Sequence, residues 1–140
     1  MSTLVKVKTG SKLEEIASYS RAVMVDNWIY VSNTAGRNPV TQEIPEDIIE
    51  QTQQVFDNIE RALAAVDATL ADVVMSRVFI QDPAETHTVM QFIGTKFRGI
   101  NPATTVTNPP LGSAEYKVEI EVTAYRGAAS AQVEEVLISV

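Results

Sequence analysis

Two carboxylates that could do acid–base chemistry lie on one predicted strand, residues 116–125. From Val118 onward its even positions are apolar, whereas two of its odd positions are the carboxylates Glu119 and Glu121. Successive side chains of a strand point to opposite faces, so both carboxylates lie on the face opposite to the apolar residues. Carboxylates placed in this way serve either as proton donors and acceptors or as partners in ion pairs.

The predicted strand over residues 73–80 adds Arg77 to the same face, together with the apolar side chains Met75 and Phe79. A sheet face of this mixed character is either solvated or covered by another subunit. Because apolar groups and Tyr125 are present among the charges, the sequence favours a subunit interface.

The chain contains no cysteine and one histidine, His87. The lack of cysteine excludes disulfides, thiolate nucleophiles and cysteine-based zinc sites. A zinc enzyme usually needs two or more histidines, and a Ser-His-Asp triad needs a well-placed one. His87 falls in a segment that we predict to be the exposed start of a helix, so we assign it no catalytic role.

The size and charge of the chain narrow the choice of partners. Its 140 residues are typical of a single domain. The net charge of −7 repels phosphate backbones, which argues against a nucleic-acid partner. There is no run of 18 apolar residues, and the first residues lack the apolar core of a signal peptide. We therefore expect no membrane partner and a cytoplasmic location.

Hydrophobic periodicity predicts six strands and two long helices. Two apolar runs on either side of Asp26-Asn27 indicate a hairpin. One helix is predicted to start at Pro45, and a second to start after Asp82 with Pro83 in its first turn. The predicted strands cover residues 4–8, 22–25, 28–31, 73–80, 104–107 and 116–125, and residues 32–39 are predicted to be a loop.

Each predicted helix joins two strands by a crossover, and such crossovers are right-handed, which places both helices on one face of the sheet. The sequence therefore predicts an α+β fold with two helices packed on one face of a mixed sheet. Residues 1–127 form the single domain in this interpretation. Residues 11–14 form either one helical turn or a loop. Residues 128–140 form either a docking helix or a frayed tail, and we expect the tail.

Several segments, taken together and in order, resemble the Rid family (YjgF-type, reactive intermediate deaminase). They span roughly residues 10 to 126, and the ordered set is more specific than any one segment. The matching segments are Tyr19-Ser20-Arg21-Ala22-Val23, Ile29-Tyr30-Val31-Ser32, Gln51-Thr52 with Asn58-Ile59, Leu70-Ala71-Asp72-Val73-Val74, Pro102-Ala103-Thr104-Thr105-Val106 and Val118-Glu119-Ile120-Glu121.

The resemblance implies a chorismate-mutase-like fold that assembles as a homotrimer with a central β-barrel. It also implies clefts between neighbouring subunits, which would bind a small-molecule ligand. In the best-known branch of the family these clefts hydrolyse imines and enamines, such as 2-aminoacrylate, to 2-oxo acids and ammonia. That branch uses no cofactor and no metal, which agrees with the absence of cysteine and the single histidine.

One position departs from the family's site. The arginine that binds the substrate carboxylate in the family follows Pro-Ala directly, and Thr104 stands there in this chain. A hydroxyl cannot form the two parallel hydrogen bonds of a guanidinium with a carboxylate. Losing a contact of about 1.5–3 kcal/mol weakens carboxylate binding on the order of 10- to 100-fold. The replacement therefore predicts an altered substrate.

Other positions match. The resemblance makes Tyr19 the cleft tyrosine, Ser32 the loop serine and Glu119 the carboxylate that positions water, although Asn33 stands where glycine is usual. Each match has a structural alternative: Tyr19 packs, Ser32 caps its loop, and Glu119 forms an intersubunit ion pair with an arginine.

Three arginines are candidates for replacing the missing cation: Arg21, Arg37 and Arg77. We expect one of them to reach the cleft from a different wall. The functional alternatives are an imine or enamine deaminase and a trimer that binds a small metabolite without converting it. Nucleic-acid cleavage is a third hypothesis, against which the net charge of −7 and the lack of a histidine pair argue.

Overall fold

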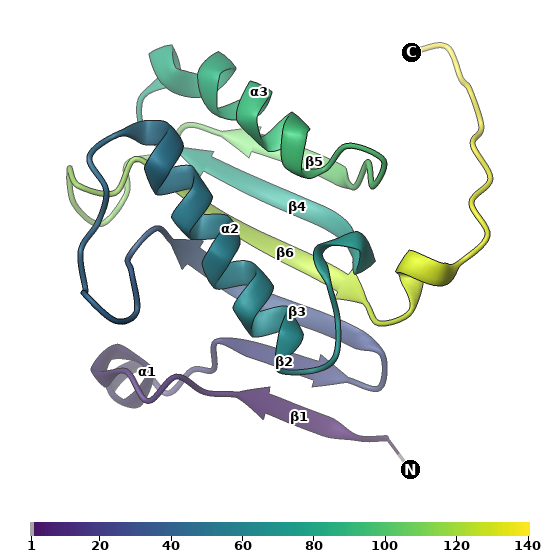
Figure 1. Ribbon diagram of the computed structural model, residues 1–140, viewed down its shortest axis with the longest axis horizontal. Helices are drawn as coiled ribbons and strands as arrows, with labels where there is room; N and C mark the ends of the chain where they lie inside the picture. Colours follow the sequence, from purple (N-terminus) through teal and green to yellow (C-terminus); the bar gives the residue numbers. More distant parts are fainter. Residues whose placement is uncertain (1) are drawn as a thin grey trace.

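Six strands form one mixed sheet in the computed structural model, which describes residues 2–140 (Figure 1). The strands follow the order β1-β2-β3-β6-β4-β5; β4 and β5 pair in parallel, and the other neighbours are antiparallel. The strands are β1 (Leu4–Val7), β2 (Ala22–Val25), β3 (Trp28–Ala35), β4 (Val73–Ile80), β5 (Ala103–Thr107) and β6 (Val118–Tyr125).

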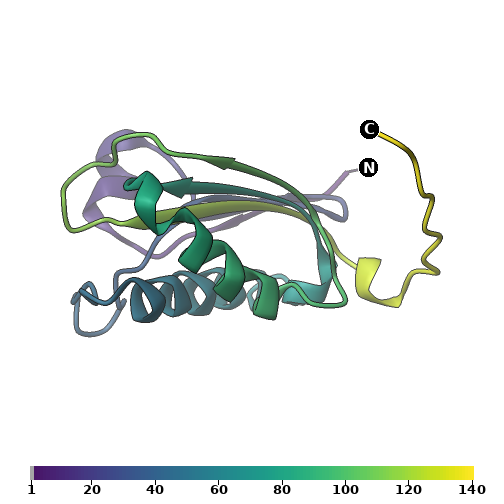
Figure 2. The same ribbon diagram turned by 90° about the horizontal axis from the view of Figure 1, so that it is seen from above.

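The two long helices, α2 (Ile48–Ala64) and α3 (Thr86–Lys96), lie on one side of this sheet (Figure 2). Helix α2 joins β3 to β4, and α3 joins β4 to β5. The predicted α+β fold with two helices on one face of a mixed sheet is therefore confirmed. The shorter elements are α1 (Lys12–Ala17) and the 3₁₀ helices η1 (Leu70–Asp72), η2 (Pro83–Glu85) and η3 (Ala128–Ser130).

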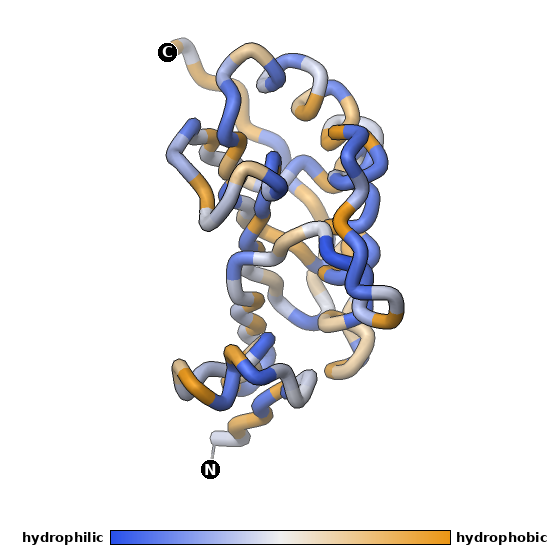
Figure 3. The backbone as a smooth tube through the Cα atoms, turned by 90° about the vertical axis from the view of Figure 1, so that its left-hand side faces the viewer, coloured by the Kyte–Doolittle hydropathy of each residue, from blue (hydrophilic) through white to orange (hydrophobic). Residues whose placement is uncertain are grey.

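The core lies between the helices and the inner face of the sheet. Phe56 of α2 is fully buried and stacks edge-to-face with Phe97, with ring centroids 5.4 Å apart. Val78 and Ile120, from the neighbouring strands β4 and β6, are also fully buried beneath the helices. Hydrophobic and hydrophilic residues follow each other closely along the chain, as the changing colours of the backbone tube show (Figure 3).

The start of the long helix differs from the prediction. Helix α2 begins at Ile48 rather than at Pro45, because the Asp47 carboxylate accepts hydrogen bonds from the backbone N–H groups of Ile49 and Glu50. These groups have no partner within the helix, so a carboxylate that binds them sets the first turn. The segment 11–14 is helical, with Ser11 as the N-cap of α1.

Strand β3 also runs further than predicted, to Ala35 instead of Val31. Its pairing with β6 continues through a bulge, because Val31 pairs with Val122 and Thr34 pairs with Ile120. Two residues of β3, Ser32 and Asn33, therefore occupy the place of one. Residues 32–35 have the small and polar composition of a loop, but pairing with β6 stabilises them as a strand.

We call the sheet face that α2 and α3 leave uncovered the open face. The strand pairs Arg77–Glu121, Phe79–Glu119 and Met75–Thr123 place these side chains together on it, as predicted from the alternation. The buried residues of the same strands, such as Ile120, point to the other face.

Candidate functional site

A hydrogen-bonded group of polar residues lies on the open face at the end of the sheet near α1. The Asn33 side chain donates from Nδ2 to Glu119 Oε1 over 2.8 Å, and Arg21 donates from Nη2 to the Asn33 carbonyl oxygen, also over 2.8 Å. Tyr19 and Ser32 complete what we call the Glu119 cluster: Tyr19, Arg21, Ser32, Asn33 and Glu119. The bulge in β3 brings Asn33 to this face, since it adds one residue between Val31 and Thr34.

The carboxylate of Glu119 is the titratable centre of the cluster. Its side chain is half-buried, and this burial raises its pKa above the usual value, while the positive charge of Arg21 offsets part of the rise. A carboxylate with a raised pKa is a stronger base when it is ionised. Glu119 can therefore take a proton from water and return it, which an exposed glutamate does less well.

The remaining members of the cluster are held by contacts within the chain. The guanidinium of Arg21 lies 6.0 Å from the centre of the Tyr19 ring, within cation–π range. The Ser32 hydroxyl donates to the Ser20 carbonyl oxygen over 2.8 Å. The Ser32 hydroxyl proton is therefore used in this hydrogen bond, whereas the hydroxyl oxygen can still accept one. Among the described residues, Arg21 Nε and Asn33 Oδ1 are buried and have no hydrogen-bond partner.

Helix α2 positions both strands that carry the cluster. Its buried Gln51 donates to the carbonyl oxygens of Pro45 (2.8 Å) and Glu115 (3.0 Å) and accepts from Lys117 N–H (2.7 Å), so it holds the chain just before Glu119. About two helical turns further along α2, Asn58 donates to the carbonyl oxygens of Ala35 and Arg37, which follow Asn33 in the chain. The polar residues of the Gln51–Ile59 motif therefore fix the ends of β3 and β6.

Thr104 lies outside the cluster within one chain. In the β4–β5 pairing Thr104 stands beside Ser76, which is fully buried on the helix-covered face. Its hydroxyl bonds to Ser76 Oγ at 2.8 Å and to the Pro102 carbonyl oxygen at 3.1 Å. Glu119 lies on the open face, so a single chain does not bring these two predicted site residues together.

The other candidate cations are bound to groups other than Glu119. Arg77 forms an ion pair with Glu121 across neighbouring strands at 2.9 Å, and both side chains are partly exposed. Arg37 donates to the Gln42 carbonyl oxygen and to the Tyr116 hydroxyl, at 2.9 and 2.8 Å. Of the three predicted arginines, Arg21 is the one whose charge acts on Glu119.

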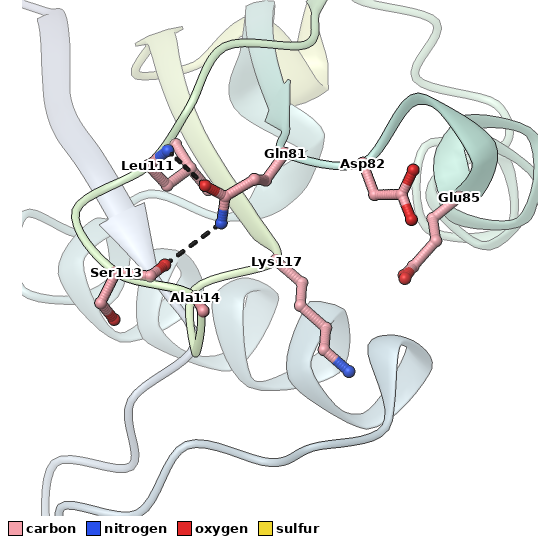
Figure 4. A pocket seen from close by; sticks show the side chains of 7 residues that line it. All are labelled: Gln81, Asp82, Glu85, Leu111, Ser113, Ala114 and Lys117. Atoms are coloured by element: carbon pink, nitrogen blue, oxygen red, sulfur yellow. Dashed lines mark hydrogen bonds between the residues drawn. The ribbon is translucent and has the colours of Figure 1, made fainter.

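A pocket of about 430 Å³ lies between the end of β4, the start of α3 and the loop before β6 (Figure 4). Gln81 ties this loop together, donating to the Ser113 carbonyl oxygen and accepting from Leu111 N–H. A wider depression of about 700 Å³ lies in the loop region 37–46. No member of the Glu119 cluster lines either pocket. In one chain the cluster therefore lies outside both of these pockets, on the open face of the sheet.

Sequence reasoning missed the direct partner of Glu119. From the sequence, Asn33 is a departure from the family's glycine, and nothing there indicates that it donates a hydrogen bond. Its polar neighbours read as loop, and the bulge that redirects Asn33 depends on pairing with residues 86 positions away. Gln51 and Asn58 were visible in the sequence, but their partners, the strand ends, were not.

Chemically, the cluster can bind and activate water next to an electrophilic carbon. It provides a carboxylate with a raised pKa, a cation and hydroxyl groups. Residues 2–140 contain no group of three or more His, Cys, Asp or Glu side chains able to hold a metal ion. None of the helices described is long and apolar enough to span a bilayer.

Comparison with known proteins agrees with this fold and cluster. Residues 9–126 match the family described as endoribonuclease L-PSP. The 2-iminobutanoate/2-iminopropanoate deaminase of Rattus norvegicus is 32% identical over 133 residues, covering 91% of this chain and 95% of that protein.

Solved structures give the same result. A member of the YjgF/YER057c/UK114 family from Mycobacterium tuberculosis has a TM-score of 0.79 and 33% identity, covering 88% of this chain and 99% of that one. The YjgF gene product of E. coli has a TM-score of 0.73 and 26% identity, covering 87% and 93%. With its residues 9–126 matched, the chain belongs to the endoribonuclease L-PSP family, which is also known as the YjgF or Rid family.

Proposed function

We propose that this protein is an imine or enamine deaminase that works without a cofactor. The observation that carries the proposal is the half-buried Glu119 carboxylate, hydrogen-bonded to Asn33 and close to the Arg21 charge. The name of the 32% identical relative, 2-iminobutanoate/2-iminopropanoate deaminase, supports the same reaction class.

In the proposed reaction an enamine first tautomerises to an imine. Glu119 then accepts a proton from water as the water oxygen bonds to the imine carbon, the C=N electron pair moves to nitrogen, and Glu119 passes this proton to the nitrogen. In the collapse of the carbinolamine, Glu119 accepts the hydroxyl proton while the C–O bond becomes a carbonyl group and the C–N bond breaks. Glu119 gives the second proton to the departing nitrogen, which leaves as ammonia, and the carboxylate is regenerated.

We further propose that the site is completed in a homotrimer whose open faces pack around a central β-barrel. The open face carries apolar and aromatic side chains such as Tyr30, which is 50% exposed in one chain. Burying such a face against two copies removes apolar surface from water. In the proposed cleft, Thr104 of one copy would approach the Glu119 cluster of the next, which one chain alone does not achieve.

The substrate is proposed to differ from small 2-imino acids, because the position of the family's carboxylate-binding arginine is Thr104. The Thr104 hydroxyl already bonds to Ser76 and to the Pro102 carbonyl oxygen. We assign Arg21 and Tyr19 the binding of an acidic or larger substrate from the opposite wall, and Ser32 the role of a hydrogen-bond acceptor beside Glu119. Arg77 remains a weaker candidate, since Glu121 neutralises it.

The test is ammonia release from imines formed in situ by an amino-acid oxidase, across a panel of amino acids. We expect release above the buffer rate, reduced in Glu119→Gln. In the same assay Thr104→Arg should lower KM for 2-imino acids on the order of 10- to 100-fold, because it restores a bidentate contact. No release from any imine, with a folded protein, would refute the enzymatic proposal.

The alternative is a trimer that binds a small metabolite without converting it. Its supporting observation is Thr104, which lacks the charge used to hold a carboxylate for hydrolysis. Ligand-dependent increases in Tm without product formation would favour this alternative. Product formation from the same ligand would exclude it.

A further inference from the structure

The chain continues beyond the residues shared with its family. The family match ends at residue 126, and 14 residues follow. Of these, residues 131–140 are extended and exposed, and we call them the tail. In Figures 1 and 2 the tail leaves the sheet at the end of β6 and runs clear of the body. It is therefore an addition to the family fold, and its residues stay exposed on the single chain.

The composition of the tail is not that of a solvated linker. Five aliphatic side chains lie at or above 75% exposure: Val133, Val136, Leu137, Ile138 and Val140. Disordered linkers are poor in such residues, because branched aliphatic groups gain by leaving water. A segment with this composition is suited to cover an apolar surface.

A row of exposed apolar side chains crosses the open face at the end of the sheet where β6 ends. Leu4, Val25, Trp28 and Tyr125 are neighbours across four adjacent strands, so their side chains form one row. They are 59%, 38%, 44% and 38% exposed. The Trp28 and Tyr125 rings contact each other edge-to-face at 4.9 Å. We call this set the terminal row.

The tail is directed away from the terminal row of its own chain. Buried Asp72 accepts hydrogen bonds from the backbone N–H groups of Gly127 and Ala129, at 3.2 and 2.8 Å, and so fixes the turn from which the tail departs. From there the tail rises on the β4–β5 side in Figure 1, whereas the terminal row lies on β1, β2, β3 and β6.

The length of the tail allows it to reach a second copy. Ten extended residues span at most about 33–36 Å. A sheet of six strands is about 24 Å wide between its edge strands, at 4.7–4.9 Å per strand. The tail is thus long enough to pass the β5 edge of its own sheet and lie on a neighbouring one.

We infer that the tail of one chain docks on the terminal row of a second copy of the chain. The inference rests on the proposed homotrimer. It adds that neighbouring subunits exchange their tails at the end of the proposed barrel. The exchanged tails cover Trp28 and Tyr125, which the helices leave open.

The cysteine-free sequence makes a direct test possible. A chain carrying both Leu137→Cys and Val25→Cys is oxidised gently and run on a non-reducing gel. We expect disulfide-linked dimers and trimers. A faster-migrating monomer, closed by its own tail, would overturn the inference, and so would the absence of any cross-link. Leu137→Cys with Val40→Cys, which places the second thiol in the loop between β3 and α2, is the positional control and should not cross-link.

Mixing the two single-cysteine chains, Leu137→Cys and Val25→Cys, covers the case in which the double variant folds poorly. Trp28, the single tryptophan, provides an independent signal. Val136→Ser/Leu137→Ser/Ile138→Ser should shift its emission to longer wavelength, whereas Glu134→Gln/Glu135→Gln should leave it in place. An unchanged spectrum in the serine variant contradicts docking.

Sedimentation of the same samples separates the two proposals. A monomeric full chain refutes the assembly and tail exchange together. A trimer without tail cross-links refutes the exchange alone. Failure of the imine assay in a cross-linked trimer refutes the proposed reaction and leaves the exchange standing.

Discussion

At the scale of single residues, three interactions act on the Glu119 carboxylate. Burial raises its pKa, the Arg21 charge acts in the opposite direction, and Asn33 donates a hydrogen bond to one of its oxygens. The hydrogen bond and the charge favour the ionised form and so oppose the burial that raises the pKa, and the ionised carboxylate can act as a base.

Replacing Glu119 by Gln should remove activity and increase stability at high pH. Because the pKa of Glu119 is raised, the native state binds its proton more tightly than the unfolded chain does, so the free energy of unfolding falls as the pH rises through that pKa. Glu119→Gln should therefore be more stable than the parent at about pH 8, with the difference vanishing at about pH 4. Its kcat should drop about 100-fold or more. Urea unfolding at both pH values and imine assays check this, and a variant less stable at pH 8 contradicts it.

Replacing Asn33 by Ala should move the acid limb of the pH–rate profile to higher pH. The variant loses the hydrogen bond to Glu119 Oε1, which favours the ionised form, so the pKa of Glu119 rises further. Rates measured between about pH 5 and 8 report the limb. Thr123→Ala, on the same open face but without a bond to Glu119, is the control and should keep the parental limb.

At the scale of elements, α2 acts as the support of the site. Its buried Gln51 spans the gap to the start of β6, and a Cβ on Gly36 would lie 2.5 Å from the Gln51 carbonyl oxygen. Helix and strand therefore approach each other so closely that only glycine fits at position 36. The two ends of the cluster, Asn33 and Glu119, are placed by this contact.

Gln51→Leu should destabilise the protein by about 2–4 kcal/mol, since it leaves the backbone groups of residues 45, 115, 117 and 118 without their partner. Activity should fall even in the fraction that stays folded, because the segment before Glu119 loosens. Gln53→Leu makes the same change at a less buried place on the helix and should cost little. Equal losses in both variants, measured by urea unfolding, would contradict this role of Gln51.

At the scale of the whole molecule, the open face is the surface through which we propose that the subunits pack. It combines aromatic and apolar side chains with the ion pair between Arg77 and Glu121, a mixture typical of subunit interfaces. The Glu119 cluster lies on this face and lines neither of the two pockets, so the proposed assembly would also complete the proposed site.

Tyr30→Glu should therefore convert the proposed trimer to a folded monomer, because a charge placed at the centre of the packed face remains unpaired. Sedimentation equilibrium gives the mass, and circular dichroism confirms the fold. Val40→Glu, in an 87% exposed loop position, should leave the mass unchanged. A trimeric Tyr30→Glu variant would show that this face is not the interface.

The sequence by itself determined the layer architecture, because alternation in β6 and helical spacing in α2 are local patterns that survive in any environment. It also determined that Glu119 and Arg77 share a face. It did not determine that β3 continues through Ser32 and Asn33, that Asn33 binds Glu119, or that Thr104 lies on the opposite face from the cluster. Those facts depend on pairing between strands distant in sequence, where one bulge shifts every following side chain to the other face, and only the tertiary structure decides where it falls.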